Sequence, residues 1–505
     1  MEVYMLFRFR VVSYLVLSVL CISGSAYGQA ELFKGLNDYI LKSMRDWETP
    51  GLALAVVRND SVIFARGYGV RKKGETAPVT AKTIFAIAST TKAMTAACLG
   101  MLVDEGKLKW DDPVTKYLPW FQLSDPYVTR ELTVRDLLCH RSGLSRGDNL
   151  WYLSSYTREE VLRRVRFLKP AWSFRSRYGY QNIMFLAAGE MIPSVTSKSW
   201  DDFIADRLFK PLGMTRTSTS VKSLSGLDDV ATPHDRIDTV MQPVRWPNFD
   251  NVGSAGAVNS CVEDMAQWIR MNLGGGMYRG KKILSADVVK EIQTPQTIIR
   301  LDSLDQVLRP SNHFAAYGFG WTLRDYLGRK LIQHDGALDG MRARVVLIPE
   351  EKFGFVILVN SSNTNLHASI AYRIIDHYLG GPVRDWSSEL LKIAKEQEAK
   401  NRAEEKKQID ERARETKPSL PLESYTGKYE HEMYGEANVQ LEGGQLTLRY
   451  FPLYVGPMTH WHYDTFQVVW DDRTFGKDLI SFTLGADGKV IEMRWQGFTE
   501  FKKVK

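Results

Sequence analysis

Cysteine is scarce in this chain of 505 residues, which contains only four. Three of them, Cys98, Cys139 and Cys261, lie beyond the first 28 residues, and an odd number without regular spacing argues against a disulfide-bonded scaffold. Cys98 falls within an apolar helical stretch, which is typical of a small buried hydrophobic residue.

The sequence also lacks any concentration of charge of one sign. Lys and Arg total 66 against 59 Asp and Glu, and the two signs are interleaved without a basic tract. Nucleic-acid binding is therefore not expected. After residue 28 no apolar run is long enough to span a bilayer, so no membrane span is expected in the mature protein.

Residues 1–28 have the pattern of a cleavable export signal. Two arginines precede an apolar run at 11–22, which is too short to span a bilayer comfortably, and small residues then predict cleavage after Gly28. Leu20 is not the small residue that a lipoprotein site needs before a cysteine, so an ordinary signal is favoured over lipidation at Cys21. The sequence predicts a secreted or periplasmic protein.

Hydrophobic patterning divides the rest of the chain, whose length predicts two or three units. Apolar runs typical of strands occur at 51–57, 61–69, 318–323, 331–334, 343–348 and 353–360. Helical spacing or capping signals occur at 32–44, 89–105, 133–140, 157–167, 183–191, 199–209, 260–272 and 367–379. Strands near both ends with helices between them predict an α/β sheet with an inserted helical subdomain.

The last quarter of the chain changes character. Residues 384–417 are rich in Lys, Arg and Glu, which favours a solvated helical spacer over an interaction helix. Residues 422–505 alternate between apolar and polar on both sides of Gly443-Gly444 and of Asp487-Gly488, the pattern of β-hairpins. This meander predicts a small all-β barrel.

Ser89-Thr-Thr-Lys92 stands where a short strand signal meets a helix, and it is the only Ser-x-x-Lys in the chain. Residues three apart are neighbours on a helix surface, so the Ser89 hydroxyl and the Lys92 amine can meet. A serine hydroxyl needs a nearby base to become a nucleophile, and the start of a helix favours developing negative charge. This stretch predicts a nucleophile.

Tyr180-Gln-Asn182 precedes an apolar helix and would place a phenol and an amide in one loop. A positive charge on Lys92 would lower the pKa of Tyr180, which would then act as general base for Ser89. Asn182 would hydrogen-bond to Lys92 or to a substrate amide. A turn tyrosine that packs on the next helix is the alternative interpretation.

His334-Asp-Gly-Ala337 lies at the end of a strand signal. Gly336 has no side chain, so a substrate backbone could lie along the strand edge. The N–H groups of Ala337 and Ser89 would form an oxyanion hole. His334 would face the site as hydrogen-bond donor or proton relay, although a single histidine on a strand is commonly structural.

These motifs resemble those of the class C β-lactamase and penicillin-binding-protein-like serine hydrolases, a group that includes DD-peptidases, D-aminopeptidases and esterases. The stretches that carry the resemblance lie at 89–92, 180–182 and 334–336, with supporting ones at 137–144, 210–214, 318–321 and 348–360. The resemblance implies an antiparallel sheet flanked by helices, an inserted helical subdomain, and an acyl-enzyme route without metal or cofactor.

The part beginning at Leu422 is similar to the lipocalin-like domain often appended to this family. The expected organisation is a signal peptide at 1–28, a β-lactamase-like hydrolase domain at 29–380, a charged helical linker at 381–418 and a lipocalin-like barrel at 419–505. The barrel is expected either to cap the active-site cleft or to mediate homo-oligomers.

One departure from the family pattern bears on the substrate. β-Lactamases of this type usually carry Lys-Thr-Gly where this chain has His334-Asp335-Gly336, and an inward-facing Asp335 would repel the carboxylate of a β-lactam. Strand alternation points Asp335 away from His334, and Arg342 or Arg344 could supply positive charge. The departure favours a peptidase or amidase over a dedicated β-lactamase.

The expected function is therefore that of an exported serine hydrolase that acts through an acyl-enzyme on small peptides or amides. A true β-lactamase or esterase is the alternative within the family, and a penicillin-binding or ligand-sensing protein with little turnover is the alternative of another class. His431, His460 and His462 lack a Cys or carboxylate that would complete a metal site, so no metal is expected.

Overall fold

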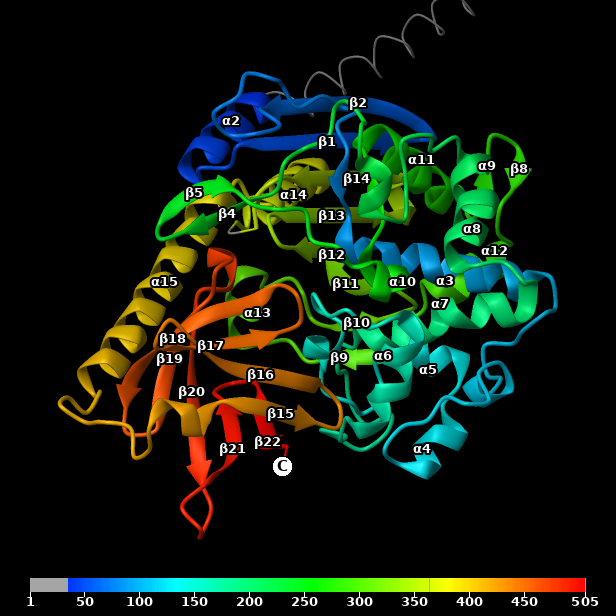
Figure 1. Ribbon diagram of the computed structural model, residues 1–505. Helices are drawn as coiled ribbons and strands as arrows, with labels where there is room; N and C mark the ends of the chain where they lie inside the picture. Colours follow the sequence, from blue (N-terminus) through cyan, green and yellow to red (C-terminus); the bar gives the residue numbers. More distant parts are fainter. Residues whose placement is uncertain (1–34, 363, 505) are drawn as a thin grey trace, which may run out of the picture.

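The computed structural model describes residues 35–362 and 364–504 (Figure 1). The predicted signal peptide at 1–28 lies outside the described residues, as do its cleavage site and Cys21. Cys98, Cys139 and Cys261 are free and buried, as their spacing predicted. In the described part of the chain, no helix combines the length and apolar character needed to cross a membrane.

An eight-stranded antiparallel sheet forms the centre of the larger part of the molecule. Its spatial order is β2 (Ser61–Gly69), β1 (Gly51–Arg58), β14 (Phe353–Val359), β13 (Met341–Ile348), β12 (Arg329–Leu338), β11 (Thr322–Tyr326), β10 (Ala315–Tyr317) and β9 (Thr297–Ile299). The first two strands precede the helical region and the other six follow it. The sheet is thus assembled from both ends of the chain, and the predicted α/β class is confirmed.

Both faces of the sheet are covered, which explains why β1 and β14 are apolar almost throughout. In β1, Ala53, Ala55 and Val57 belong to one hydrophobic cluster, whereas Leu52, Leu54 and Val56 belong to another. Side chains alternate across a strand, so a strand between two helical layers buries every position. The result is a three-layer arrangement with a core on each side of the sheet.

The outer face is covered by helices from the two ends of this part, α2 (Leu36–Asp46), α14 (Leu366–Leu379) and the start of α15 (Trp386–Asp410). The inner face packs against α3 (Thr91–Asp104) and α11 (Val262–Leu273). The inner layer joins the inserted helical region, so the nucleophile-bearing helix lies between the sheet and that region (Figure 1).

The inserted region is built from short helices whose ends are fixed by side-chain caps. Thr157 caps α6 through a capping box with Glu160, and Thr133 caps α5 in the same way with Asp136. The helices of this region and those that follow it are α4 (Pro126–Glu131), α5 (Val134–Leu138), α6 (Arg158–Arg164), α7 (Asn182–Thr196), α8 (Trp200–Ile204), α9 (Lys210–Leu212), α10 (Gly253–Gly256), α12 (Ala286–Ile292) and α13 (Ser303–Leu308).

Three small two-stranded sheets lie outside the central one. They pair β3 (Phe85–Ala86) with β6 (Asn259–Ser260), β4 (His234–Ile237) with β5 (Val240–Pro243), and β7 (Met277–Tyr278) with β8 (Lys281–Lys282). The β3–β6 pair holds the chain just before Ser89 against the chain just after α10. This pairing brings two segments that flank the site into register.

Two sequence expectations about local structure are corrected. The helix expected at 133–140 ends at Leu138, because His140 adopts a left-handed backbone with φ of 57° that a helix cannot continue. The strand expected at 318–323 begins only at Thr322, since residues 318–321 form the turn that reverses the chain between β10 and β11. The His334 motif lies in the last part of β12, at the end of a strand as expected.

The C-terminal part is a closed eight-stranded barrel, as the meander predicted. Its strands are β15 (Gly427–His431), β16 (Gly435–Glu442), β17 (Gln445–Tyr450), β18 (Tyr454–His462), β19 (Thr465–Val469), β20 (Lys477–Leu484), β21 (Val490–Trp495) and β22 (Thr499–Lys503). Gly443 and Gly444, with φ of 59° and 84°, form the tight turn between β16 and β17. Helix α15 leads from the first part to this barrel (Figure 1).

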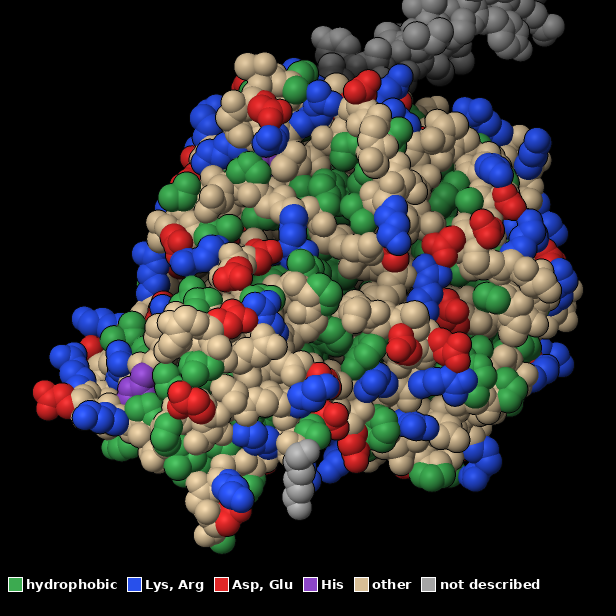
Figure 2. Space-filling model, viewed as in Figure 1, with side chains coloured by type: hydrophobic (Ala, Val, Ile, Leu, Met, Phe, Trp, Pro, Cys, Tyr) green, Lys and Arg blue, Asp and Glu red, His purple; other side chains and the backbone are tan. Residues whose placement is uncertain are grey.

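The barrel packs against the helical region rather than standing apart from it. Met433 joins the core cluster of the larger part, Arg164 donates to the Glu432 and Met433 carbonyls, and Arg245 pairs with Asp472 at 2.6 Å. Figure 2 shows Lys and Arg interspersed with Asp and Glu over the face in view. The barrel is therefore docked directly on the helical region of the larger part.

Candidate active site

Ser89 lies in a 3-10 turn (Ala88–Thr90) that leads directly into α3. The residue before it, Ala88, is buried and has a φ of 49°, a left-handed conformation that is uncommon for a residue with a side chain. Such strain persists only where the surroundings hold the backbone in place, and it is common at functional sites. The sharp turn at Ala88 presents the partly exposed Ser89 to a cavity.

Lys92 lies one turn further on, as the spacing predicted, and its side chain is fully buried. Its Nζ lies 3.1 Å from Ser89 Oγ and donates to the carbonyl oxygen of Ala255 at 2.7 Å. Burial lowers the pKa of the Lys92 amine well below its usual range, against the attraction of Asp148. A neutral amine beside a serine hydroxyl can accept its proton.

The structure brings Tyr180 to the same place but corrects the expected protonation. The Lys92 Nζ lies 4.9 Å from the centre of the Tyr180 ring. Burial raises the pKa of Tyr180, and a hydrogen bond to Ser89 only partly opposes that effect. Lys92 is not a charged neighbour that lowers the Tyr180 pKa, because burial disfavours the charge on both groups. Tyr180 is therefore a phenol, and Lys92 is the available base.

Asn182 opens α7 and lines the same cavity, although it does not contact Lys92 as one expectation had it. Its Nδ2 donates to Asp148 Oδ1 at 2.9 Å, and the same oxygen accepts from Trp151 Nε1 at 3.0 Å. The other Asp148 oxygen pairs with Arg146. Asp148 thus fixes the Asn182 amide from a segment that carried no sequence signal.

Gly336 on β12 explains how the third motif approaches Ser89. A Cβ at this position would lie 2.2 Å from the Ile87 carbonyl oxygen and 3.1 Å from Ala88 Cβ. The space left by the missing side chain is therefore filled by the chain's own backbone, not by a substrate as the sequence suggested. The glycine lets β12 pass in direct contact with the turn that carries Ser89.

A substrate can still lie along β12 beyond this point. The pairing of β12 with β11 ends at Gln333, whereas its pairing with β13 continues to Leu338. The β12 edge from His334 to Leu338 is thus open on the side where the cavity lies, and Ala337 lines that cavity. The geometry supports the expected approach of substrate to the strand edge and to the Ala337 N–H.

His334 is buried, and both of its ring nitrogens have partners. Nε2 lies 2.8 Å from the Tyr317 hydroxyl and Nδ1 lies 2.6 Å from the Asp335 carbonyl oxygen. Since a carbonyl only accepts, Nδ1 donates and Nε2 accepts from Tyr317. Burial lowers the pKa of His334 to about 4. His334 is thus a neutral ring held by two hydrogen bonds. It positions the site rather than relaying a proton.

Asp335 points away from His334, as alternation predicted, and is neutralised by a cross-strand partner. Arg344 on β13 lies directly opposite and forms two hydrogen bonds to its carboxylate, at 2.5 and 2.7 Å. Burial works against the charge on Asp335, but Arg344 outweighs it and holds the pKa of the carboxyl well below its usual range. Asp335 therefore presents no free negative charge to a substrate, and Arg344 is not available to bind one.

The cavity in front of Ser89 has a volume of about 310 Å³. Sequence reasoning had identified six of the residues that line it, Ser89, Tyr180, Asn182, His334, Asp335 and Ala337. It missed the residues contributed by loops and by the helical region, Arg146, Trp151, Tyr178, Phe249, Val252, Ala255 and Gly256, and two on strands β11 and β12, Thr322 and Leu338. Lys92 lies beneath the floor, where its amine reaches Ser89.

His140 is a buried neighbour that the sequence did not mark as part of the site. Its Nδ1 accepts from the Gln181 N–H at 3.0 Å, while its Nε2 has no partner among the described residues. Its ring centre lies 4.2 Å from that of Tyr180 and 4.5 Å from that of Tyr317. His140 therefore supports the ring that faces Ser89. His140 lies in the 137–144 stretch, which supported the family resemblance but predicted no role for this residue.

The histidines considered as metal ligands have other partners. His431 Nδ1 accepts from the Met433 and Tyr434 N–H groups, and His460 Nε2 lies 2.8 Å from the Tyr463 carbonyl oxygen. Across residues 35–362 and 364–504, no group of three or more His, Cys, Asp or Glu is arranged to hold a metal ion.

The buried histidines predict an acid-sensitive fold. Burial lowers the pKa of His334 to about 4, that of His367 to about 3, and that of His140 well below its usual value. These histidines charge near pH 6.5 in the unfolded chain, so stability is lost as the pH falls below 6.5. Each contributes a slope of up to about 1.4 kcal/mol per pH unit. Urea unfolding between pH 7 and pH 5 measures this slope.

His367→Gln is expected to flatten the slope without touching the cavity, because His367 lies on the outer helix α14. If the unchanged chain had equal free energies of unfolding at pH 7 and pH 5, the acid sensitivity assigned to the buried histidines would be contradicted.

The fold and the site together define a class, an antiparallel sheet flanked by helices with a Ser–Lys pair beneath a strand edge. A family model described as beta-lactamase matches residues 36–379, and a second, described as a domain of unknown function (DUF3471), matches residues 411–504. The first match covers more than half of the chain. The chain belongs to the β-lactamase family.

The relatives of this chain include hydrolases. It is 29% identical over 437 residues to the unguisins hydrolase ungD of Aspergillus violaceofuscus, a match that covers 80% of this chain and 76% of that protein. Among solved structures, the octameric penicillin-binding protein homologue from Pyrococcus abyssi aligns with a TM-score of 0.62 at 22% identity, over 93% of this chain and 99% of that chain. A D-stereospecific amidohydrolase from Streptomyces sp. aligns with a TM-score of 0.55 at 19% identity, over 68% of this chain and 99% of that chain.

Proposed function

We propose that this protein is an exported serine hydrolase that acts through an acyl-enzyme on small peptides or amides. The observation that carries the proposal is the 3.1 Å approach of the buried Lys92 amine to the Ser89 hydroxyl, on the floor of a cavity. Burial lowers the pKa of that amine well below its usual range, which favours the neutral form that can accept a proton. The residues that complete the site lie in the loop before α7 (Tyr180), at the start of α7 (Asn182) and on β12 (His334 and Ala337). They converge on the Ser89–Lys92 pair.

In the proposed reaction, Ser89 Oγ attacks the substrate carbonyl carbon while its proton passes to Lys92 Nζ. The carbonyl electron pair moves to the oxygen, which the N–H groups of Ser89 and Ala337 stabilise. Tyr180, still protonated and hydrogen-bonded to Ser89, gives a proton to the leaving amine and regains one from Lys92. Water then attacks the acyl-Ser89 ester by the reverse path and releases the acid.

Support for an amide substrate comes from the site and from the relatives. Arg344 is engaged by Asp335, and the buried His334 is neutral, so this part of β12 offers no free positive charge for the carboxylate of a β-lactam. The open edge of β12 suits an extended peptide. Two of the matched proteins are named as an unguisins hydrolase and a D-stereospecific amidohydrolase. An esterase or a true β-lactamase remains the alternative reaction within the family.

Export is proposed from the N-terminal sequence alone. The positively charged and apolar segments of residues 1–28, followed by small residues, favour cleavage after Gly28 and a secreted or periplasmic location. N-terminal sequencing of the protein recovered from the producing cells tests this, and a mature chain that begins at Met1 would contradict it.

Ser89→Ala is expected to abolish covalent labelling by a fluorescent acylating probe and to lower turnover by a factor on the order of 10⁴ to 10⁶. The exposed Ser303→Ala, on α13, is the matched control and should label like the unchanged protein. Equal labelling of Ser89→Ala and the unchanged chain would refute Ser89 as nucleophile.

A panel of D-amino-acid amides, nitrocefin and short-chain p-nitrophenyl esters identifies the reaction. Preferential turnover of the amides is the expected result. Measurable binding without turnover of any of them would instead favour the alternative of another class, a penicillin-binding or ligand-sensing protein.

A further inference from the structure

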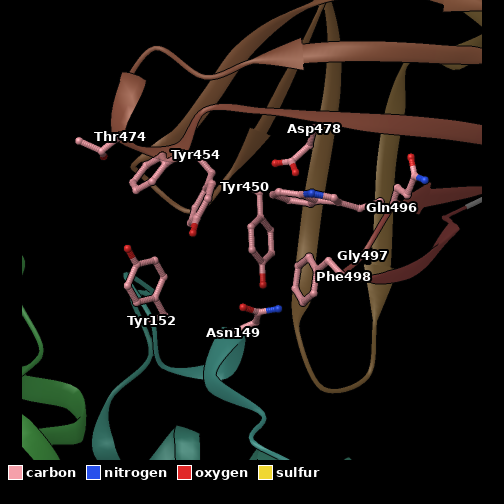
Figure 3. A pocket seen from close by; sticks show the side chains of 11 residues that line it. Asn149, Tyr152, Tyr450, Tyr454, Thr474, Asp478, Gln496, Gly497 and Phe498 are labelled. Atoms are coloured by element: carbon pink, nitrogen blue, oxygen red, sulfur yellow. The ribbon is translucent and has the colours of Figure 1, made fainter. Parts of the chain in front are cut away.

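A second cavity, of about 300 Å³, lies where the barrel meets the helical region (Figure 3). Its barrel side carries Tyr450, Tyr454, Phe475, Trp495 and Phe498, and its other side carries Tyr152. Figure 3 shows Tyr152 and Asn149 reaching it from the helical region, opposite the tyrosines of the barrel. Neither the proposed reaction nor the barrel's own packing accounts for this space.

The aromatic rings of this cavity are arranged as a box. The ring centre of Trp495 lies 5.6 Å from that of Tyr450, 5.8 Å from that of Tyr454 and 5.1 Å from that of Phe498. The planes of these three rings are inclined at 81°, 76° and 81° to the Trp495 plane. Three rings thus pack edge-to-face against the fourth, and all four line the cavity.

Two acidic side chains add negative charge to this box. Asp478 lines the cavity and accepts from Trp470 Nε1 at 2.7 Å, while Asp339 accepts from the Tyr152 hydroxyl at 2.7 Å. Among the described residues neither has a Lys or Arg within 4.0 Å, although Arg245 and Arg342 act on Asp339 from farther away. Burial raises the pKa of both carboxyls.

The positively charged side chain beside this cavity, Arg245, does not occupy it. Arg245 lies with its Cζ 5.3 Å from the centre of the Phe475 ring, and Asp472 holds it at 2.6 Å. The Phe475 ring in turn stacks on Tyr454 at 4.5 Å. Phe475 thus contacts both Arg245 and Tyr454.

We propose that this aromatic cage, formed by Tyr152, Tyr450, Tyr454, Trp495 and Phe498 with Asp478, binds an alkylammonium group of the substrate. The faces of aromatic rings attract cations, and quaternary ammonium groups are recognised by cages of this kind. A purely apolar guest would give the carboxyl of Asp478 no partner beyond the hydrogen bond from Trp470.

The cage and the catalytic cavity share two walls. Trp151 lines the cavity at Ser89 and Tyr152 lines the cage, with ring centres 6.0 Å apart. Likewise Leu338 lines the first, and the next residue, Asp339, holds the Tyr152 hydroxyl. One substrate can therefore place its carbonyl at Ser89 and its cationic end in the cage, an assignment that rests on the proposed function.

Binding is tested on the full chain carrying Ser89→Ala, so that no turnover interferes. Choline and its neutral isostere 3,3-dimethylbutan-1-ol are titrated by calorimetry and by tryptophan fluorescence. Choline is expected to bind about tenfold more tightly, the effect of one or two cation–π contacts. Equal affinities, or tighter binding of the neutral alcohol, would overturn the cage.

Variants separate the cage from general damage to the barrel. Tyr454→Leu and Asp478→Asn should each remove the preference for choline, whereas Tyr463→Leu, on the exposed surface of the barrel, should keep it. Circular dichroism verifies that each variant is folded. If Tyr454→Leu does not fold, Asp478→Asn, which keeps the shape of the side chain, decides the question alone. A folded variant that keeps the tenfold preference would count against the assignment.

Kinetics with the unchanged chain then distinguishes the two proposals. A choline ester should show a KM about tenfold below that of the 3,3-dimethylbutyl ester of the same acid. Choline binding without hydrolysis of either ester supports the cage and counts against the proposed function. Hydrolysis of both esters with equal KM overturns the cage and leaves the proposed function standing.

Discussion

Lys92→Met is expected to lower kcat for acylation of Ser89 by about 10³-fold, within the range that general-base catalysis contributes. The methionine fills the buried space but cannot accept the Ser89 proton. The protein should stay folded, because the substitution removes an amine whose charge is disfavoured by burial. The Ala255 carbonyl does lose its hydrogen-bond donor. Single-turnover acylation by the probe and urea unfolding measure the two effects.

Lys92→Arg is the informative contrast, because it introduces a permanent positive charge and removes the base. A guanidinium cannot lose its proton in a protein, and this site disfavours a charge. We expect Lys92→Arg to be as inactive as Lys92→Met and less stable by several kcal/mol. An active Lys92→Arg would show that the site needs a positive charge rather than a proton acceptor, and would refute the assigned role of Lys92.

Gly336→Ala is expected to cost about 1–3 kcal/mol of stability and about 10²-fold in kcat/KM. The added Cβ would lie 2.2 Å from the Ile87 carbonyl oxygen, a backbone atom that cannot rotate away. Relief requires β12 to move from the turn that carries Ser89, which separates Ala337 from the nucleophile. Urea unfolding and turnover of the best substrate of the panel measure the two losses.

Gly256→Ala is the matched control, because Gly256 lies on the other side of the same turn. A Cβ there would meet Ala88 at 3.8 Å, which is ordinary van der Waals contact. This variant should fold as stably as the unchanged chain, and it is a control for stability alone because Gly256 itself lines the cavity. Equal losses of stability in the two variants would mean that any added methyl group at this turn is harmful, and the specific role assigned to Gly336 would fail.

The sequence predicted those features that depend on neighbours along the chain. The three-residue spacing of Ser89 and Lys92 defined their contact, and the capping residue Thr157 and the Gly443-Gly444 turn marked an element boundary and a hairpin. Alternation also placed Asp335 on the opposite side of β12 from His334. Each of these results follows from local geometry, which a pattern in one stretch of sequence can express.

The sequence could not predict features that arise between distant segments. Asp148 holds Asn182, Tyr317 holds His334, and Ile87 fills the space beside Gly336, and none of these pairs shares a local pattern. The expected pKa of Tyr180 was wrong for the same reason, because burial is a property of the assembled fold. The left-handed Ala88 is likewise imposed by its surroundings, since alanine has no intrinsic preference for that conformation.

Residues 148–152 form one short segment with two faces. Asp148 holds Asn182, and Trp151 lines the cavity at Ser89, while Asn149 and Tyr152 line the cavity at the barrel. A ligand at Ser89 and a cation in the proposed cage would meet the same segment, and any coupling between them is reciprocal. By whatever factor a cation in the cage changes the affinity for a ligand at Ser89, that ligand changes the affinity for the cation by the same factor. The barrel thereby gains an energetic connection to the catalytic serine without contributing an atom to the reaction.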